Sequence, residues 1–177
     1  MLAAADALFT DTDVPQSVSM DDIAAAAGVG KGTLFRAFGS RDNLLDALFA
    51  ERMASLRAAV RIGDPPLGPG TPPRERVLGI LDALLTFKLD NRQLMRAREV
   101  ATSGLLQAEH YRWLHGTLRD LIAQAAASGA SAVDAGYAAH VLLGALRPDL
   151  IDELLTSGES PQTIRQAQNA LARRILD

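Results

Sequence analysis

The 177-residue sequence contains no cysteine, so it offers neither a disulfide framework nor a thiolate for nucleophilic chemistry. Aromatic residues make up only 5% of the chain, and no apolar run approaches the roughly 18 residues that span a bilayer. The first residues, MLAAADALF, lack the positive flank and the cleavage signature of an export signal. We therefore expect a cytoplasmic protein without a membrane-spanning segment.

The sequence also lacks a basic surplus, because 18 lysines and arginines face 21 aspartates and glutamates and the net charge is −3. Taken alone, this balance argues against a nucleic-acid partner. Averages hide local patches, however, and the segment from Ala24 to Arg41 carries Lys31, Arg36 and Arg41 and no acid. This basic segment on an acidic chain is the feature of the charge pattern that requires an explanation.

Alanine and leucine dominate the composition and β-branched residues are sparse, which favours helices over strands. Apolar residues recur at helical spacing along the chain and predict an all-α fold of about nine helices. Residues with capping chemistry mark several of the predicted helix ends: Ser19 with Asp22, Gly28, Ser40, and Ser160 with Pro161.

A stretch rich in proline and glycine, GDPPLGPGTPPR at residues 63–74, interrupts the helical pattern. We predict an N-terminal domain over residues 1–50, whose last helix begins near residue 41 and continues to about 62. A larger helical domain is predicted over residues 51–177. Within this larger domain, a helix is expected to end near Gly129, and the next to begin around Ser131 and to kink at Pro148.

The sequence GVGKGT at residues 28–33 looks at first like a phosphate-binding loop, but its spacing fails. A Walker-type loop requires a glycine where Ala25 stands and a serine or threonine where Gly32 stands. The dinucleotide-binding pattern requires a third glycine at the position of Thr33. The segment before the glycines, DDIAAAA, predicts a helix rather than the buried strand that both motifs need. We therefore reject both nucleotide-binding interpretations.

A helix-turn-helix explains the same residues. The first helix ends at Gly28, and Val29 fills the turn. Ile23 anchors the first helix to the core, and Leu34 and Phe38 anchor the second. The opposite face of the second helix carries basic and small residues suited to a DNA major groove: Lys31, Gly32, Thr33, Phe35, Arg36 and Ala37. The alternative is a plain turn between two surface helices, which the selectively basic composition disfavours.

The stretch SVSMDDIAAAAGVGKGTLFRAFGSRDNLLDALFAERM resembles the DNA-binding signature of TetR-family transcriptional regulators. That signature contains D-I-A-x-x-A-G-V, K-G-T-L-Y and S-[KR]-[DE]-x-L-L in this order, and the match covers roughly Leu2 to Met53. The resemblance implies a homodimer of all-α subunits, each with a three-helix head that binds a palindromic operator. It also implies a helical body that binds a small molecule and thereby releases the DNA, most commonly as a repressor.

This chain departs from the family pattern at several polar positions. Gly30 stands where a serine is usual, Phe35 where a tyrosine is usual, and Ala37 where a tyrosine or histidine is frequent. The sequence begins at MLAAADALF, without the basic arm that usually precedes the first helix. Since each lost phosphate contact lowers the salt dependence by about one unit of slope, we expect a modest operator affinity.

Within the head, Arg36 is the candidate for a base-edge contact, with guanine as its partner. Lys31 and Arg41 are expected to bind phosphates, and the small residues of the helix to allow a close approach to the bases. The predicted DNA-binding residues are Ser17, Ser19, Lys31, Gly32, Thr33, Phe35, Arg36 and Arg41. The alternative for each exposed charge is simple solvation.

The larger domain is expected to supply the dimer surface and the effector pocket. Apolar stripes on the last two long helices predict an isologous four-helix interface: Val141, Leu142, Ala145, Leu146, Ile164, Ala167, Leu171 and Ile175. Aromatic and polarisable residues predict a largely apolar pocket for a small molecule: Phe87, Met95, His110, Tyr111, Trp113 and Tyr137. Packing inside one subunit is the alternative for the stripes, and an ordinary core role is the alternative for the aromatic residues.

No enzyme is predicted, because His110, His115 and His140 lack metal-ligand spacing and no nucleophile motif is present. We accordingly expect no catalytic residues, no metal and no cofactor. The main alternative function is a helical protein-interaction module without sequence-specific DNA binding, which the acidic net charge suits. Salt-dependent retardation of duplex DNA would separate the two, since only a regulator should show it.

Overall fold

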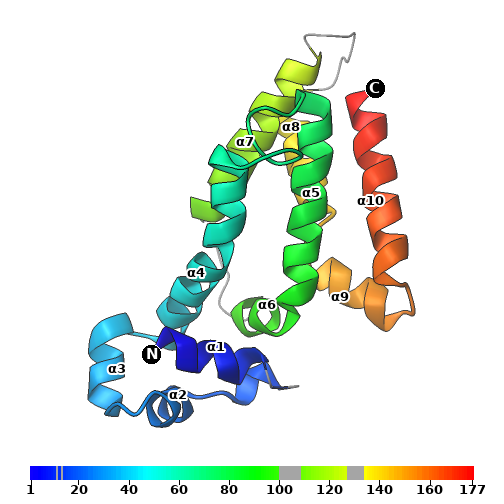
Figure 1. The fold of residues 1–177 in the computed structure, drawn as a ribbon. Helices are drawn as coiled ribbons and strands as arrows, with labels where there is room; N and C mark the ends of the chain where they lie inside the picture. Colours follow the sequence, from blue (N-terminus) through cyan, green and yellow to red (C-terminus); the bar gives the residue numbers. More distant parts are fainter. Residues whose placement is uncertain (11, 13, 100–108, 127–133) are drawn as a thin grey trace. The chain divides into compact units, whose positions relative to one another are not determined.

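The computed structural model describes residues 1–10, 12, 14–99, 109–126 and 134–177. Over these residues the chain forms ten α-helices and one short 3-10 helix, without any strand (Figure 1). None of the described helices is long and apolar enough to cross a membrane. The all-α prediction is confirmed, and the number of helices is close to the nine expected.

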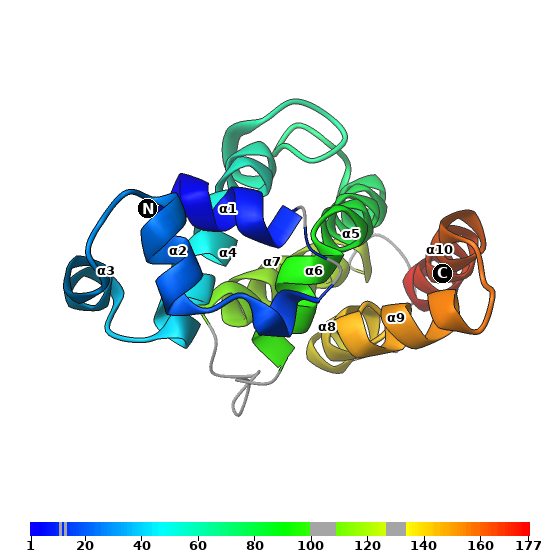
Figure 2. The ribbon, with the colours of Figure 1, turned by 90° about the horizontal axis from the view of Figure 1, so that it is seen from below.

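The first of two compact units contains residues 1–54 and helix α6. Its elements are α1 (Leu2–Thr10), η1 (Pro15–Ser17), α2 (Met20–Ala26), α3 (Lys31–Phe38), the first part of α4 (Arg41–Ile62), and α6 (Arg92–Glu99). Helix α1 contacts α2 and α6, η1 contacts α6, and α2 contacts α3 (Figure 2). Phe9, Ile23, Leu34 and Leu44 are fully buried and form the core of this unit.

Local capping chemistry sets the helix ends of this first unit. The Ser19 hydroxyl accepts the Asp22 amide at 3.2 Å, and the Asp22 carboxylate accepts the Ser19 amide at 2.9 Å, so the predicted capping box is present. The amide of Asn43 donates to the Ser40 hydroxyl at 3.1 Å, which places Ser40 at the start of α4 as predicted. These caps satisfy helix amides that otherwise have no partner.

The second unit contains residues 55–89 and helices α7 to α10. Its elements are the last part of α4, most of α5 (Pro73–Asp90), α7 (Glu109–Ala126), α8 (Ala135–Gly144), α9 (Pro148–Thr156) and α10 (Pro161–Leu176). Helix α7 contacts α8, and α10 contacts α7, α8 and α9. The Arg165 guanidinium of α10 is paired with Asp82 of α5 and donates to Thr86 at 3.1 Å.

The segment around Pro148 forms two helices rather than one kinked helix. Helix α8 ends at Gly144, Arg147 has an extended backbone with ψ of 138°, and α9 begins at Pro148. Proline has no amide hydrogen and a fixed φ, so it fits the first turn of a new helix better than the interior of an old one. The predicted boundaries near Gly129 and Ser131 lie outside the described residues; the described parts of α7 and α8 end at Ala126 and begin at Ala135.

Candidate nucleic-acid interface

The turn between α2 and α3 has a backbone conformation that favours glycine at position 28. Gly28 has φ of +65°, a left-handed conformation that residues with a side chain rarely adopt. Its amide donates to the Ala25 carbonyl at 3.1 Å, and the Val29 amide donates to the Ala24 carbonyl at 3.0 Å. Gly30 is the N-cap of α3 and accepts the Thr33 amide at 2.9 Å. The two helices are therefore joined by the short turn that the sequence predicts.

Helix α3 is anchored on one side and open on the other. Leu34 is fully buried, whereas Phe38 is half-buried, so Leu34 is the principal anchor. The residues on the opposite side are all exposed: Lys31, Gly32, Thr33, Phe35, Arg36 and Ala37. The fold thus presents a complete helix face without burying any of its predicted contact residues.

Lys31 on this face is paired with an acid. Its ammonium lies 2.7 Å from one Asp21 carboxylate oxygen and 2.9 Å from the other, and the two side chains are 61% and 62% exposed. The segment from Ala24 to Arg41 contains no acid, but the α2–α3 turn brings Asp21, which precedes this segment, close to Lys31. Since exposed ion pairs contribute little, a phosphate can replace Asp21 as the partner of Lys31.

Arg36 differs from Lys31 in its surroundings. Its side chain is exposed on the middle of α3, and no residue that the structure describes forms an ion pair or hydrogen bond with it. A guanidinium in this position retains all five donors for an outside partner. The geometry therefore leaves the predicted base-edge contact of Arg36 open.

Arg41 and the two serines have roles inside the unit. The Arg41 guanidinium donates to the Val18 carbonyl at 3.0 Å and to the Pro15 carbonyl at 2.8 Å, and it lies 5.6 Å from the centre of the Phe9 ring. Ser17 donates to the Val14 carbonyl at 2.7 Å, and Ser19 caps α2. Their phosphate contacts stay predictions, because these polar groups already position η1 and the start of α2.

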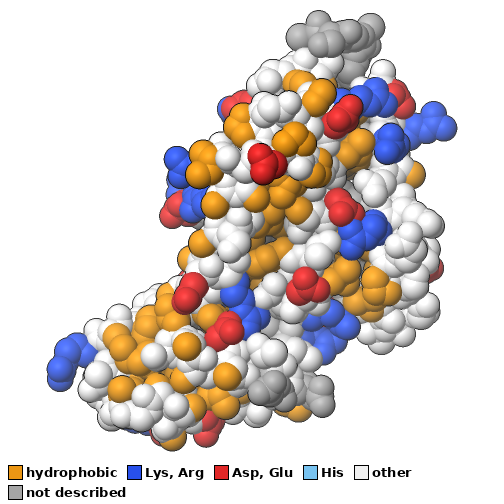
Figure 3. Space-filling view, viewed as in Figure 1, with side chains coloured by type: hydrophobic (Ala, Val, Ile, Leu, Met, Phe, Trp, Pro, Cys, Tyr) orange, Lys and Arg blue, Asp and Glu red, His pale blue; other side chains and the backbone are white. Residues whose placement is uncertain are grey.

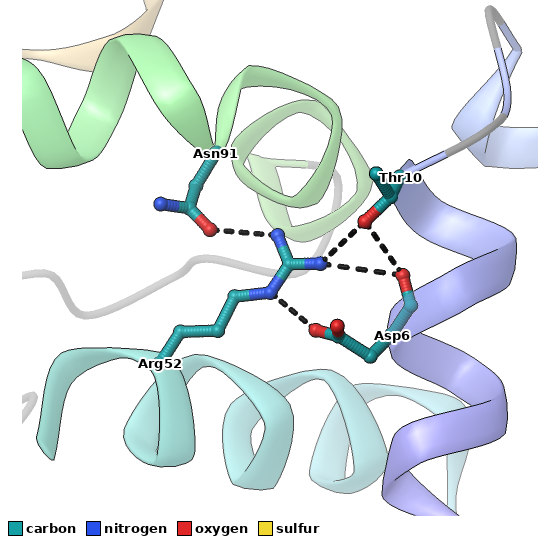
Figure 4. A network of polar contacts seen from close by, with 4 residues as sticks. All are labelled: Asp6, Thr10, Arg52 and Asn91. Atoms are coloured by element: carbon teal, nitrogen blue, oxygen red, sulfur yellow. Dashed lines mark hydrogen bonds and ion pairs between the residues drawn. The ribbon is translucent and has the colours of Figure 1, made fainter.

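Long-range arginine contacts that the sequence did not reveal hold α6 in the first unit. Arg52 of α4 donates to Asp6 and Thr10 of α1 and to Asn91, the residue before α6 (Figure 4). Arg98 of α6 pairs with Asp46 of α4 at 2.6 Å, and its guanidinium carbon lies 4.0 Å from the centre of the Phe49 ring. Since these partners lie 39 to 52 residues apart, no local sequence pattern indicates them.

The residues of the predicted pocket are divided between the two units. Phe87, His110, Tyr111 and Trp113 are half-buried in the second unit, whereas Met95 is buried in the first. Tyr137 is 69% exposed on α8. These placements leave four residues as candidates for one site in the second unit, and the pocket itself stays a prediction.

Two histidines join the aromatic residues of α7. The Tyr111 hydroxyl lies 2.7 Å from His140 Nδ1, and the His115 and His140 rings are stacked with their centres 3.9 Å apart. His115 Nε2 lies 3.0 Å from the Gly136 carbonyl oxygen. Burial raises the pKa of the Tyr111 hydroxyl. The sequence gives no sign of this cluster, because His140 is on α8 and the other two residues are on α7.

Charged side chains of α4 and α5 contact α7 and the segment between α8 and α9. Arg57 pairs with Glu109 at 2.8 Å and lies 5.0 Å from the centre of the Trp113 ring, and its hydrogen bond lowers the pKa of the Glu109 carboxyl. The Lys88 ammonium donates to the Leu146 carbonyl. Burial lowers the Lys88 pKa to about 8; the negative charge of Asp149 opposes this shift, and the positive charge of Arg147 adds to it.

A cavity of about 370 Å³ lies in the first unit, and none of the six predicted pocket residues lines it. It is formed by α1, the segment after it, and α2, and most of its lining is apolar, including Ala4, Leu8, Val18 and Ala26. Since they share no lining residue, the cavity and the predicted pocket are separate features of the chain.

Among the described residues, no group of three or more histidines, cysteines or carboxylates has metal-binding geometry.

The predicted dimer residues separate into buried and exposed sets. Leu142, Leu146 and Ile164 are buried within their own unit, which explains part of the apolar stripes. Val141 and Leu171 are 36% and 37% exposed, and Ala167 is exposed as well. Ala145 and Ile175 are half-buried. The exposed set on α8 and α10 is what remains available for a second subunit.

Comparison with known proteins extends the N-terminal resemblance. Residues 1–48 match the family model described as bacterial regulatory proteins of the tetR family. An uncharacterized HTH-type transcriptional regulator of Mycobacterium tuberculosis is 37% identical over 93 residues. That match covers 51% of this chain and 43% of the relative, so less than half of the relative's length is spanned.

Two solved structures share the fold over nearly the whole chain. A TetR-like transcriptional regulator from Rhodococcus sp. RHA1 is 26% identical, with a TM-score of 0.64 over 98% of this chain and 91% of the other. A structure named as a gamma-butyrolactone receptor, an ArpA-like protein, is 19% identical, with a TM-score of 0.59 over 99% of this chain and 94% of the other. Together with the helix-turn-helix described above, these matches show that residues 1–48 form a DNA-binding domain of the tetR family of bacterial regulatory proteins, and that the chain shares the fold of a TetR-like transcriptional regulator.

Proposed function

We propose that the protein is a ligand-responsive repressor that binds a palindromic operator as a homodimer through α2 and α3. The observation that carries the proposal is the outward face of α3. Its six residues, from Lys31 to Ala37 without Leu34, are all exposed, and the buried Leu34 anchors the helix on the opposite side. Arg36 lies at the middle of this face with all its donors available, which suits a bidentate contact to guanine.

The ion pair of Lys31 with Asp21 is compatible with this function. Both groups are well exposed, so the pair is screened by solvent and salt. A DNA phosphate at the same position would attract Lys31 and repel Asp21. We therefore expect Lys31 to bind phosphate with a smaller net gain than an unpaired lysine, and this adds to the reasons for a modest operator affinity.

Support for the homodimer comes from α8 and α10, which contact each other in the second unit. Val141, Ala167 and Leu171 expose apolar surface there, and Tyr137 adds an exposed aromatic ring. An isologous interface uses the same surface of both subunits and matches the two-fold symmetry of a palindrome. Two copies of α3 would then have to lie about 34–36 Å apart to enter successive major grooves.

The proposed effector is a small, largely apolar molecule that binds in the second unit. Phe87, His110, Tyr111 and Trp113 supply half-buried aromatic surface, and Tyr111 with its neighbouring histidines supplies hydrogen-bonding groups. A solved protein of this fold is named as a gamma-butyrolactone receptor, and a gamma-butyrolactone is a small molecule of the kind proposed here. Such an effector releases DNA only if it binds more tightly to a conformation in which the two α3 helices are wrongly spaced for the operator than to the DNA-binding conformation.

Duplex binding by the full chain tests the proposal and distinguishes it from a helical interaction module. A pool of random duplexes is offered to the protein, and the retained sequences are titrated at several salt concentrations in the cytoplasmic range. A regulator should retain palindromic duplexes, with two chains per duplex and an affinity that falls steeply with salt. An interaction module should retain no preferred sequence. A cytoplasmic location follows from the function, because the operator is chromosomal DNA.

A further inference from the structure

The outward face of α3 combines one guanidinium with a mostly apolar surface. At about 100° per residue, Gly32 and Arg36 lie opposite Leu34, at the centre of the exposed face. Phe35 lies on one side of this centre, and Thr33 and Ala37 lie on the other. A ring and two methyl groups therefore border the only guanidinium of the helix.

Phe35 offers carbon rather than a polar group. Phe35 is 39% exposed and therefore accessible to a partner. Its phenyl ring has no hydroxyl with which to bind phosphate. The Lys31 ammonium lies 6.0 Å from the centre of the ring and is held by Asp21. Figure 3 shows a basic side chain projecting at the α3 end of the first unit, beside surface that is hydrophobic or uncharged. Charge on this face is thus sparse.

Gly32 leaves room at the centre of the face. A Cβ added there would meet no atom within 4 Å, and Gly32 is not among the glycines with positive φ. The chain's own packing and backbone therefore do not demand a glycine at this position. The missing side chain lets a partner approach the helix backbone beside Arg36 and brings the flanking carbon groups within contact distance.

From this arrangement, and resting on the proposed function, we infer that α3 reads thymine methyl groups on both sides of a guanine. Arg36 binds the guanine edge, Phe35 contacts a thymine C5-methyl on one side, and the methyl groups of Thr33 and Ala37 contact another on the opposite side. In the major groove only thymine presents a methyl group, so apolar contact separates thymine from cytosine. Each operator half-site should therefore contain a guanine flanked by thymines.

Replacing thymine by deoxyuridine tests the inference, because it removes only the C5-methyl. A duplex selected by the full chain from a random pool is synthesised with one deoxyuridine at a time, and dissociation constants are measured by fluorescence anisotropy. Loss of one contacted methyl should weaken binding about fourfold, the value for burying one methyl-sized group. Thymines beside the guanine should show this loss, and thymines outside the half-sites should not.

Variants assign each methyl to a side chain. Phe35→Ala should abolish the deoxyuridine effect at one thymine, and Thr33→Ser, which removes only a methyl, should reduce it at the other. Arg36→Ala should weaken binding and leave both ratios unchanged, which makes it the matched control. All three side chains are exposed, and circular dichroism checks that the variants remain folded.

The outcomes distinguish the inference from the function on which it rests. Binding of selected duplexes with no deoxyuridine effect in either half-site, or selection of half-sites without thymine beside guanine, would overturn the thymine readout and leave the regulator intact. Failure to bind any duplex in a salt-dependent manner would overturn both. Thymine-specific losses that disappear in the Phe35 and Thr33 variants would establish the readout.

Discussion

Arg52 of α4 and Asp6 of α1 form an ion pair in which Nε lies 2.5 Å from the carboxylate oxygen (Figure 4). The same guanidinium donates to the Asp6 carbonyl at 3.3 Å, to the Thr10 hydroxyl at 2.9 Å and to the Asn91 side-chain oxygen at 2.6 Å. Only 17% of the Arg52 side chain is exposed. One side chain thus connects the first helix of the DNA-binding head with Asn91, the residue before α6.

Removal of this guanidinium should destabilise the head. Arg52→Ala leaves Asp6 and Asn91 without their partner, so the free energy of unfolding should fall by about 2 kcal/mol. Arg52→Lys should recover only a fraction of the loss, since an ammonium cannot reach the partners of a planar fork. Urea unfolding followed by circular dichroism measures both. The exposed Arg61 offers the matched control, and Arg61→Ala should change stability by no more than about 0.5 kcal/mol.

Gly32→Ala should separate stability from DNA binding. Alanine stabilises a helix interior by up to about 1 kcal/mol relative to glycine, and at Gly32 its Cβ meets no atom of the protein. The variant should therefore unfold at a higher temperature and yet bind the selected duplex more weakly, because the Cβ enters the groove. Gly116→Ala, in the interior of α7 and equally free of close contacts, should stabilise the protein without affecting DNA affinity. Unchanged affinity of Gly32→Ala would show that α3 does not approach DNA closely.

Lys88 should make stability rise with pH on the alkaline side. Its pKa is about 8 in the folded protein and 10.5 ordinarily, so between these values the unfolded chain binds more protons than the folded one. Raising the pH through this window therefore favours the folded state. The difference of about 2.5 units, at about 1.4 kcal/mol each, corresponds to on the order of 3 kcal/mol.

Lys88→Met removes this titration while keeping a long apolar side chain. Its unfolding free energy, measured from pH 7 to pH 10.5, should lack the rise that the unmodified chain shows, and the difference between the two curves cancels other titrating groups. At neutral pH the variant loses the hydrogen bond to Leu146, but it also no longer buries an ammonium. We therefore expect it to be no less stable than the unmodified chain at neutral pH. Parallel curves over this range would mean that the Lys88 ammonium is solvated.

A charge on the exposed seam of α8 and α10 should separate the proposed dimer. Leu171→Arg places a guanidinium on a side chain that is already partly exposed, so one subunit should fold normally while association weakens. Sedimentation velocity should show a monomer, and duplex binding should become weak. Ile62→Arg is the control, because Ile62 is 85% exposed on α4 and lies outside the predicted seam. A Leu171→Arg dimer as stable as the Ile62→Arg dimer would place the interface elsewhere.

The features predicted correctly from sequence are local ones. The Ser19–Asp22 capping box, the left-handed Gly28 and the exposed face of α3 each depend on residues a few positions apart. A periodic pattern of apolar residues also sufficed for the helical class, because helix faces repeat within one or two turns.

The features that the sequence did not reveal depend on distant residues. Asp21 reaches Lys31 only because the turn reverses the chain, and Arg52 gathers partners 46 residues before it and 39 after it. Apolar periodicity likewise could not separate Leu142, which is buried in its own unit, from Val141, which is exposed. A helical stripe shows that a face is apolar, but it does not show whether the same subunit or a second one covers that face.

Discrimination between operator sequences by Arg36 tests the central claim most directly. Fluorescence anisotropy of the full chain on a selected palindrome and on a scrambled duplex of the same composition gives the preference of each variant. Arg36→Ala should reduce this preference by about 1–3 kcal/mol per half-site, whereas Lys31→Ala should weaken both duplexes alike and Arg61→Ala should change neither. Full preference for the palindrome in the Arg36→Ala variant would contradict the account, because the sequence would then be read by another region of the molecule.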